Sequence, residues 1–194
     1  MPALQTPWGI ADTVIRLDPD NRFLRVHTPS HGGIGVHPAQ AIPDHIASCA
    51  NVDAEGWRWF EEDINVAAVM VAFPHLFCIN TVAAAKDALR HHLPEVYTRH
   101  FGEALTAANS HAIERREFEA ASRDKFVVTA GFGSSFWDVP GGYVYACGFR
   151  RSDEATAGFL VPSARYARPE RLILDDFPRW EPDRTLPMHK PRTD

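Results

Sequence analysis

Two short motifs carry side chains that could do chemistry. His31-Gly32-Gly33 follows a strand-like segment, and Glu61-Glu62-Asp63 places three carboxylates in a row. A histidine beside flexible glycine backbone can act as an acid, a base or a metal ligand. A carboxylate can act as a general base or as a ligand of a divalent cation. The candidate catalytic residues are therefore His31, Glu61 and Asp63, and the candidate binding residues beside them are Gly32 and Gly33.

Both motifs also have a purely structural interpretation. Successive residues of a helix point about 100° apart, so a helix over 57–71 would hold Glu61 close to its buried stripe and its two acidic neighbours toward the flanks. A carboxylate in that position must be paired or hydrogen-bonded, and acidic residues in a first turn also suit the helix dipole. The glycines after His31 can simply close a hairpin. Both interpretations stay open at this point.

The remaining motifs are weaker indicators of chemistry. His27 and His31 stand four residues apart, but Pro29 and Gly32 argue against the helix that would place them on one face, so histidines alone predict no zinc site. The segment 131–142 is rich in glycine but matches neither a phosphate-binding loop nor the G-x-S-x-G turn of serine hydrolases. We expect no cofactor, and the sequence does not identify a metal.

The segment 131–142 also carries three large aromatic side chains, Phe132, Phe136 and Trp137. Aromatic residues dominate the hot spots of protein interfaces, so these three are candidate binding residues for a protein partner. The same side chains can instead fold back onto the neighbouring strands. The sequence leaves both possibilities open.

The pattern of elements along the chain predicts how these residues are held. Strands are expected over 8–17, 22–27 and 34–36, and again over 125–130, 143–149, 158–161 and 171–174. Helices are expected within 38–50 and over 57–71, 81–92 and 103–123, with Asp53 as the N-cap of the second and Pro74 at its end. This order predicts an α+β fold: one antiparallel sheet built from N- and C-terminal strands, and a central block of about three helices, one of them buried. A single domain is expected over 1–177, followed by a proline-rich, extended or disordered tail over 178–194.

Composition narrows the class of protein. The chain has 194 residues, 45% of them hydrophobic, and a formal net charge of −5, which are values of a globular protein without a general affinity for nucleic acid. The cysteines Cys49, Cys78 and Cys147 form no CxxC motif and have apolar neighbours, which predicts buried free thiols. We find neither a signal-peptide pattern nor an apolar run of bilayer length, so we expect a cytoplasmic protein without a membrane partner.

Five landmarks occur in order along the chain: Thr6–Gly9, Thr28–Gly33, Gly56–Asp63, Val139–Gly142 and Phe159–Pro162. In this order the chain resembles an uncharacterised family of domains of unknown function that is met in proteins of bacterial plasmids, integrated elements and phages. The resemblance spans roughly residues 6–175. It implies a mobile-element setting and no activity that can be named.

Two functions follow as hypotheses. The first is an accessory protein that binds a host or element protein, for instance to block a defence system, which predicts an exposed apolar patch around Phe132, Phe136 and Trp137. The second is a metal-assisted hydrolase or nuclease, which predicts that His31 lies within a few ångströms of Glu61 or Asp63. The net negative charge argues against a nucleic-acid partner.

Overall fold

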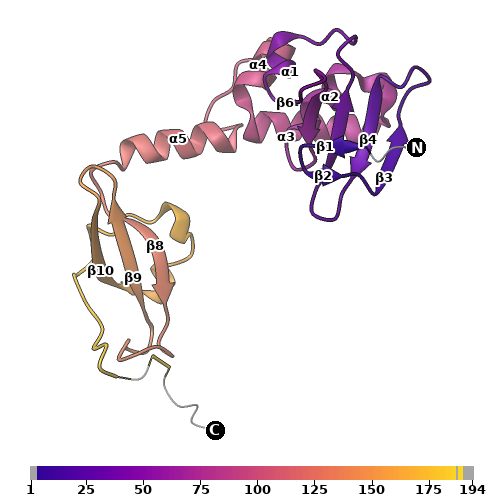
Figure 1. Ribbon diagram of the computed structural model, residues 1–194. Coiled ribbons are helices and arrows are strands. Elements are labelled where there is room, and N and C mark those ends of the chain that lie inside the picture. The colour runs from indigo at the N-terminus through magenta and orange to yellow at the C-terminus, as the bar shows by residue number, and fades with distance from the viewer. Residues whose placement is uncertain (1–3, 187, 190–194) are drawn as a thin grey trace. The chain divides into compact units, whose positions relative to one another are not determined.

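The computed structural model describes residues 4–186, 188 and 189 (Figure 1). Contacts within the chain divide it into two compact units, the N-terminal unit (residues 1–115) and the C-terminal unit (residues 116–194). The single domain expected over 1–177 stays a prediction. The two units are described separately below.

The N-terminal unit is built on a five-stranded antiparallel sheet with the strand order β3-β4-β5-β7-β6. Its strands are β3 (Thr13–Arg16), β4 (Phe23–His27), β5 (Gly32–Val36), β6 (Asn51–Val52) and β7 (Arg58–Glu61). Two further short strands, β1 (Gln5–Thr6) and β2 (Gly9–Ile10), pair with each other. The strand expected over 8–17 is therefore broken between β2 and β3, and β5 begins two residues earlier than expected.

The helices of the chain are α1 (Asp44–Ala47), α2 (Val66–Ala72), α3 (Ile79–His92), α4 (Pro94–Phe101) and α5 (His111–Ala121), with a 3₁₀ turn at Pro74–Leu76. The most buried of them is α2, which buries Ala67, Ala68, Val69 and Val71. The expectation of one buried helix is thus confirmed. Helix α4 was not expected, because Pro94 predicts the end of a helix. Proline is also well tolerated in the first turn of a helix, and here Pro94 starts a new one.

The expected helix over 57–71 is wrong in its first half. Residues 58–61 form strand β7, and the helix begins only at Val66. The run Trp57-Arg58-Trp59-Phe60 combines aromatic side chains that suit a strand buried on both faces. Asp53 is accordingly no helix cap: its carboxylate accepts hydrogen bonds from the backbone N–H groups of Glu55 and Trp57 and from the indole of Trp59.

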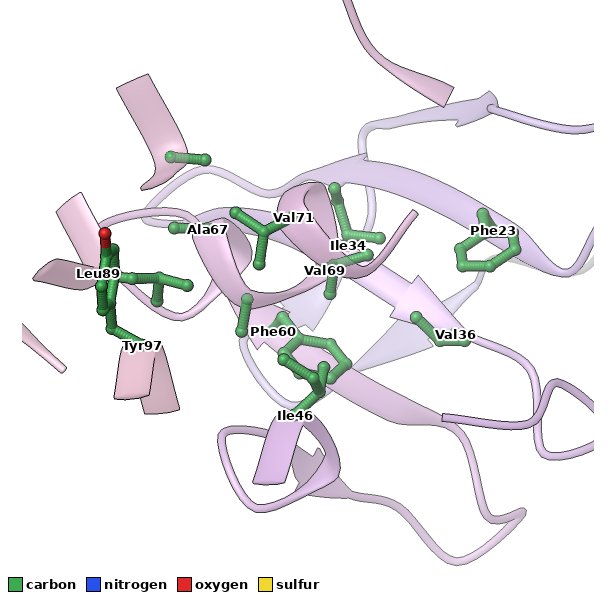
Figure 2. Close-up of a cluster of buried hydrophobic side chains, with 12 residues drawn as sticks. Phe23, Ile34, Val36, Ile46, Phe60, Ala67, Val69, Val71, Leu89 and Tyr97 are labelled. Carbon is green, nitrogen blue, oxygen red and sulfur yellow. The ribbon is translucent and has the colours of Figure 1, made fainter. Parts of the chain in front are cut away.

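Both faces of this sheet are covered at its centre. On one face, Ile34, Val36 and Phe60 pack against side chains of α2, as Figure 2 shows. On the other face, Trp59 packs with Leu24, Val26 and Trp8. Side chains alternate between the faces along each strand, so neighbouring residues of β7 belong to different surroundings.

The C-terminal unit contains a three-stranded antiparallel sheet, with the order β10-β9-β8. Its strands are β8 (Val127–Phe132), β9 (Tyr143–Arg150) and β10 (Ala155–Pro162), and two 3₁₀ turns follow at Ser163–Arg165 and Pro169–Arg171. The α+β class is confirmed, but the N- and C-terminal strands form separate sheets, because β8 to β10 pair with one another as successive hairpins. The strand expected over 171–174 reduces to one bridge between Ile173 and Val127.

The first residues of the expected tail are held in place. Backbone hydrogen bonds join Leu160 to Pro178 and Trp180 to Gly158, so the chain runs along β10 there. Residues 187 and 190–194 of the expected tail lie outside the described residues. Among the described helices, none is long and apolar enough to cross a membrane.

The cysteines differ in part from the expectation. All three are free, as expected, but Cys78 is exposed, and Cys49 and Cys147 are only partly buried. Cys78 stands immediately before α3, where its apolar neighbours in sequence do not cover it.

Candidate functional site

The structure brings together two of the three candidate catalytic residues. His31 stands immediately before β5 and Glu61 ends β7, and these strands are neighbours, with Gly33 opposite Glu61. Nδ1 of His31 lies 3.3 Å from Oε1 of Glu61, an ion pair whenever the imidazole is protonated. The histidine side chain is about half exposed, so solvent and small molecules can reach the pair.

Asp63 does not join this pair. It lies beyond the end of β7, exposed to solvent, and no ion pair connects it to His31 in the described part of the chain. More broadly, the residues that the structure describes contain no group of three or more His, Cys, Asp and Glu side chains that could hold a metal ion. The candidate catalytic residues that the structure brings together are thus one imidazole and one carboxylate.

Glu62 belongs to a different site from Glu61. The two are successive residues at the end of a strand, so they point to opposite faces of the sheet. Glu62 lines a pocket of about 190 Å³ whose other walls are Arg25, His27, Gly33, Ile34, Val66 and Met70. This pocket combines a cation, a carboxylate and an imidazole with an aliphatic floor.

This pocket was not expected from the sequence, although the alternation of side chains along β7 indicates it. Once residues 58–61 are recognised as a strand, alternation separates Glu61 from Glu62 and places Glu62 on the face that carries Phe60. Arg25 and His27 alternate with the buried Leu24 and Val26 in the same way on β4. From the sequence, His27 was a candidate zinc ligand only, and Arg25 was no candidate.

The two positions of the His31 motif require glycine for different structural reasons. At Gly33, a Cβ atom would overlap the carbonyl oxygen of Phe60 and the ring of Trp8. At Gly32, a Cβ atom would overlap a carboxylate oxygen of Glu62 and lie 3.0 Å from Nδ1 of His27. Gly33 therefore makes room for an aromatic ring, whereas Gly32 makes room for the polar ends of Glu62 and His27.

The aromatic side chains of the segment 131–142 are folded back. Phe132, Phe136 and Trp137 are each only partly exposed. The ring of Phe132 lies 5.4 and 5.1 Å from the other two, centroid to centroid, and stacks on Tyr145 at 6.0 Å. Burial and a hydrogen bond to Glu181 raise the pKa of Tyr145 well above its usual value. Partner binding by these three residues stays a prediction, but they do not form an open apolar patch.

Apolar side chains are instead exposed at one edge of the five-stranded sheet. All four residues of β3 are exposed, with Val14 at 43% and Ile15 at 47%, and Ile10 on β2 reaches 56%. Among the described strands, β3 pairs only with β4, so its other side is an open edge. Leu17 donates a backbone hydrogen bond to Phe23, which by alternation turns the N–H and C=O groups of Val14 and Arg16 outward.

Fold and surface together describe an α+β protein with an open sheet edge, a histidine–carboxylate pair and a small polar pocket, all in the N-terminal unit. Residues 2–123 match a family described as a domain of unknown function, DUF7007, and the chain belongs to this family. The expected kind of family is thereby confirmed, although the match ends before the landmarks Val139–Gly142 and Phe159–Pro162. No curated protein and no solved structure matches the chain significantly.

Proposed function

We propose that the protein is an accessory protein of mobile genetic elements that acts by binding a protein partner along strand β3. The observation that carries the proposal is the open edge of the five-stranded sheet, with its exposed Val14 and Ile15. The mobile-element setting rests on the resemblance in sequence pattern alone.

An open edge strand offers a partner both hydrogen bonds and apolar contact. The outward N–H and C=O groups of Val14 and Arg16 can pair with an extended segment of another protein, as in strand addition. Val14 and Ile15 point to opposite faces of the strand, so an added strand would cover apolar surface on both sides. Natural proteins usually protect such edges with charges, proline or bulges, and β3 carries one charge, Arg16.

The opposite edge of the sheet is a poorer docking site. Strand β6 has only two residues, Asn51 and Val52, although the side chain of Val52 is 64% exposed. Two residues provide too few backbone hydrogen bonds to seat a partner strand. Val52 is therefore a suitable control position, because it is an exposed aliphatic residue on the same sheet.

The proposal can be tested by affinity capture with three versions of the full chain: wild type, the double variant Val14→Lys/Ile15→Lys, and the control Val52→Lys. We expect that wild type and the control variant capture the same partner protein and that the double variant does not capture it. Binding is then reconstituted from the two purified proteins, where the double variant should bind at least about tenfold more weakly. If the reconstituted pair binds the double variant as tightly as wild type, the edge is not the docking surface.

The distance between His31 and Glu61 favours a second candidate function, acid–base catalysis by a hydrolase or nuclease. A carboxylate can orient an imidazole that takes a proton from water, and the exposed ring is accessible to a substrate. The test is hydrolysis of phosphoester and carboxylic ester substrates by wild type, His31→Ala and Glu61→Gln, with metal content measured by elemental mass spectrometry. Turnover lost in both variants supports this function, and absence of turnover by wild type eliminates it for these substrates.

A further inference from the structure

The pocket between β4, β5, β7 and α2 holds two charged side chains without a counter-ion. Arg25 is partly buried and Glu62 is exposed, and in the described part of the chain neither forms an ion pair, with each other or with a third residue. Arginine at the wall of a pocket is suited to binding a carboxylate, because its guanidinium presents two parallel donors. A carboxylate beside it is suited to binding an ammonium group.

A glycine of the main chain lets two polar side chains of this region lie close together. At Gly32, any side chain would overlap Oε2 of Glu62 and approach Nδ1 of His27 to 3.0 Å, so both atoms face the same spot above the backbone. An ammonium group that enters the pocket can donate hydrogen bonds to the Glu62 carboxylate, and the His27 ring lies next to that carboxylate. Gly32 therefore lets the Glu62 carboxylate and the His27 ring come together at one place, where the side chain of an alanine would push them apart.

The rest of the pocket is aliphatic and small. Ile34, Val66 and Met70 line it, and its volume is about 190 Å³. Pockets for drug-sized ligands measure about 300–1,000 Å³, so this one suits a ligand with few atoms. Methionine adapts its shape to an aliphatic neighbour, which suits a branched hydrocarbon group.

We propose that this pocket binds a free α-amino acid with an aliphatic side chain. Its carboxylate pairs with Arg25, its ammonium group contacts Glu62 and His27, and its side chain packs on the aliphatic floor. A peptide terminus fits less well, because it carries only one of the two charges. The proposal is independent of partner binding along β3.

The test is an NMR titration of the ¹⁵N-labelled full chain with L-leucine and two analogues that each lack one charge. 4-Methylpentanoate has no ammonium group, and 3-methylbutylamine has no carboxylate. We expect L-leucine to shift amides of β4, β5 and α2, and each analogue to bind at least about tenfold more weakly, the effect of losing one charge-assisted contact.

Two variants test which pocket residue binds each charged group of the ligand. Arg25→Met should weaken the binding of L-leucine about tenfold and leave the binding of 3-methylbutylamine unchanged. Glu62→Gln should weaken the binding of L-leucine and leave the binding of 4-methylpentanoate unchanged. Arg22→Met is the matched control, because Arg22 is an exposed arginine paired with Asp20 near the start of β4, and it should bind like wild type. Because Glu62 is exposed, its variant stays interpretable even if Arg25→Met fails to fold. Equal binding of all three compounds, or no shift with L-leucine, would overturn the proposal.

Discussion

Replacing Gly33 by alanine tests the packing of the N-terminal unit beside the His31 motif. A Cβ atom at this position would overlap the carbonyl oxygen of Phe60, which belongs to the neighbouring strand and cannot move away freely. It would also overlap the ring of Trp8, which contacts Trp59 edge to face at a centroid distance of 6.2 Å. The sheet must therefore shift, or Trp8 must leave its place.

The expected cost follows from these two overlaps. Overpacking a closed site costs about 1–3 kcal/mol, and loss of an aromatic pair costs about 0.5–1.5 kcal/mol. Alanine restricts the unfolded chain more than glycine does, which offsets about 0.5–1 kcal/mol of this destabilisation. We expect Gly33→Ala to lower the free energy of unfolding by about 2 kcal/mol, which corresponds to a shift of the urea midpoint by about 1 M.

The matched control is Gly32→Ala, one residue away on the same strand. Its Cβ atom meets the ends of two flexible side chains, Glu62 and His27, which can rotate toward solvent. We expect this variant to unfold within about 0.5 kcal/mol of wild type. The assay is urea unfolding followed by far-UV circular dichroism and tryptophan fluorescence. If both variants are equally stable, Trp8 does not pack over Gly33 and the explanation of the motif is wrong.

Two further predictions concern stability. Asp53→Ala removes the acceptor for two backbone N–H groups and for the indole of Trp59, so we expect urea unfolding to show a free energy of unfolding lower by about 2–3 kcal/mol. Asp53→Asn keeps one acceptor oxygen and should lose less stability. Equal stability of wild type and both variants would contradict the assigned role. Burial, together with the neighbouring His45, lowers the pKa of His100 below its usual 6.5, so the unfolded chain takes up this proton first as the pH falls. Stability should therefore decrease below about pH 6.5 and decrease less in His100→Gln, as measured by urea midpoints at about pH 7.5 and about pH 5.5; identical pH profiles of the two proteins would refute this assignment.

Elements with a regular and unambiguous pattern were predictable from the sequence. The alternation of Phe23–His27 predicted β4, and the segment around α2 is apolar on every side and was correctly expected to be buried. The segment 57–61 was misread because Trp57, Phe60 and Ile64 stand at helical spacing as well as in a strand-like run. Local pattern cannot separate these two possibilities, since tertiary pairing with β5 decides between them.

The glycine-rich strand β5 shows more clearly what local sequence pattern cannot predict. Gly32-Gly33-Ile34-Gly35-Val36 has low intrinsic strand propensity, yet all five residues are buried at the centre of the sheet. Two large rings from elsewhere in the chain, Trp8 over Gly33 and Trp59 over Gly35, occupy the space that side chains would take. Such compensation depends on contacts that a single sequence does not display.

The candidate site was predictable in part. The proximity of His31 and Glu61 was predicted by the hydrolase hypothesis alone, and Glu61 was expected on a helix although it ends a strand. The pocket of Arg25 and Glu62 depends on the register of three strands, which the sequence alone does not specify.

The most direct test of partner binding along β3 is hydrogen exchange of the protein with and without its purified partner. The amides of Val14 and Arg16 face outward in the free protein and should exchange fast. Addition of the partner should slow both amides strongly, because an added strand accepts hydrogen bonds from them. Protection that leaves these two amides unchanged and falls on residues 132–137 instead would contradict the proposal and return the interface to the aromatic segment.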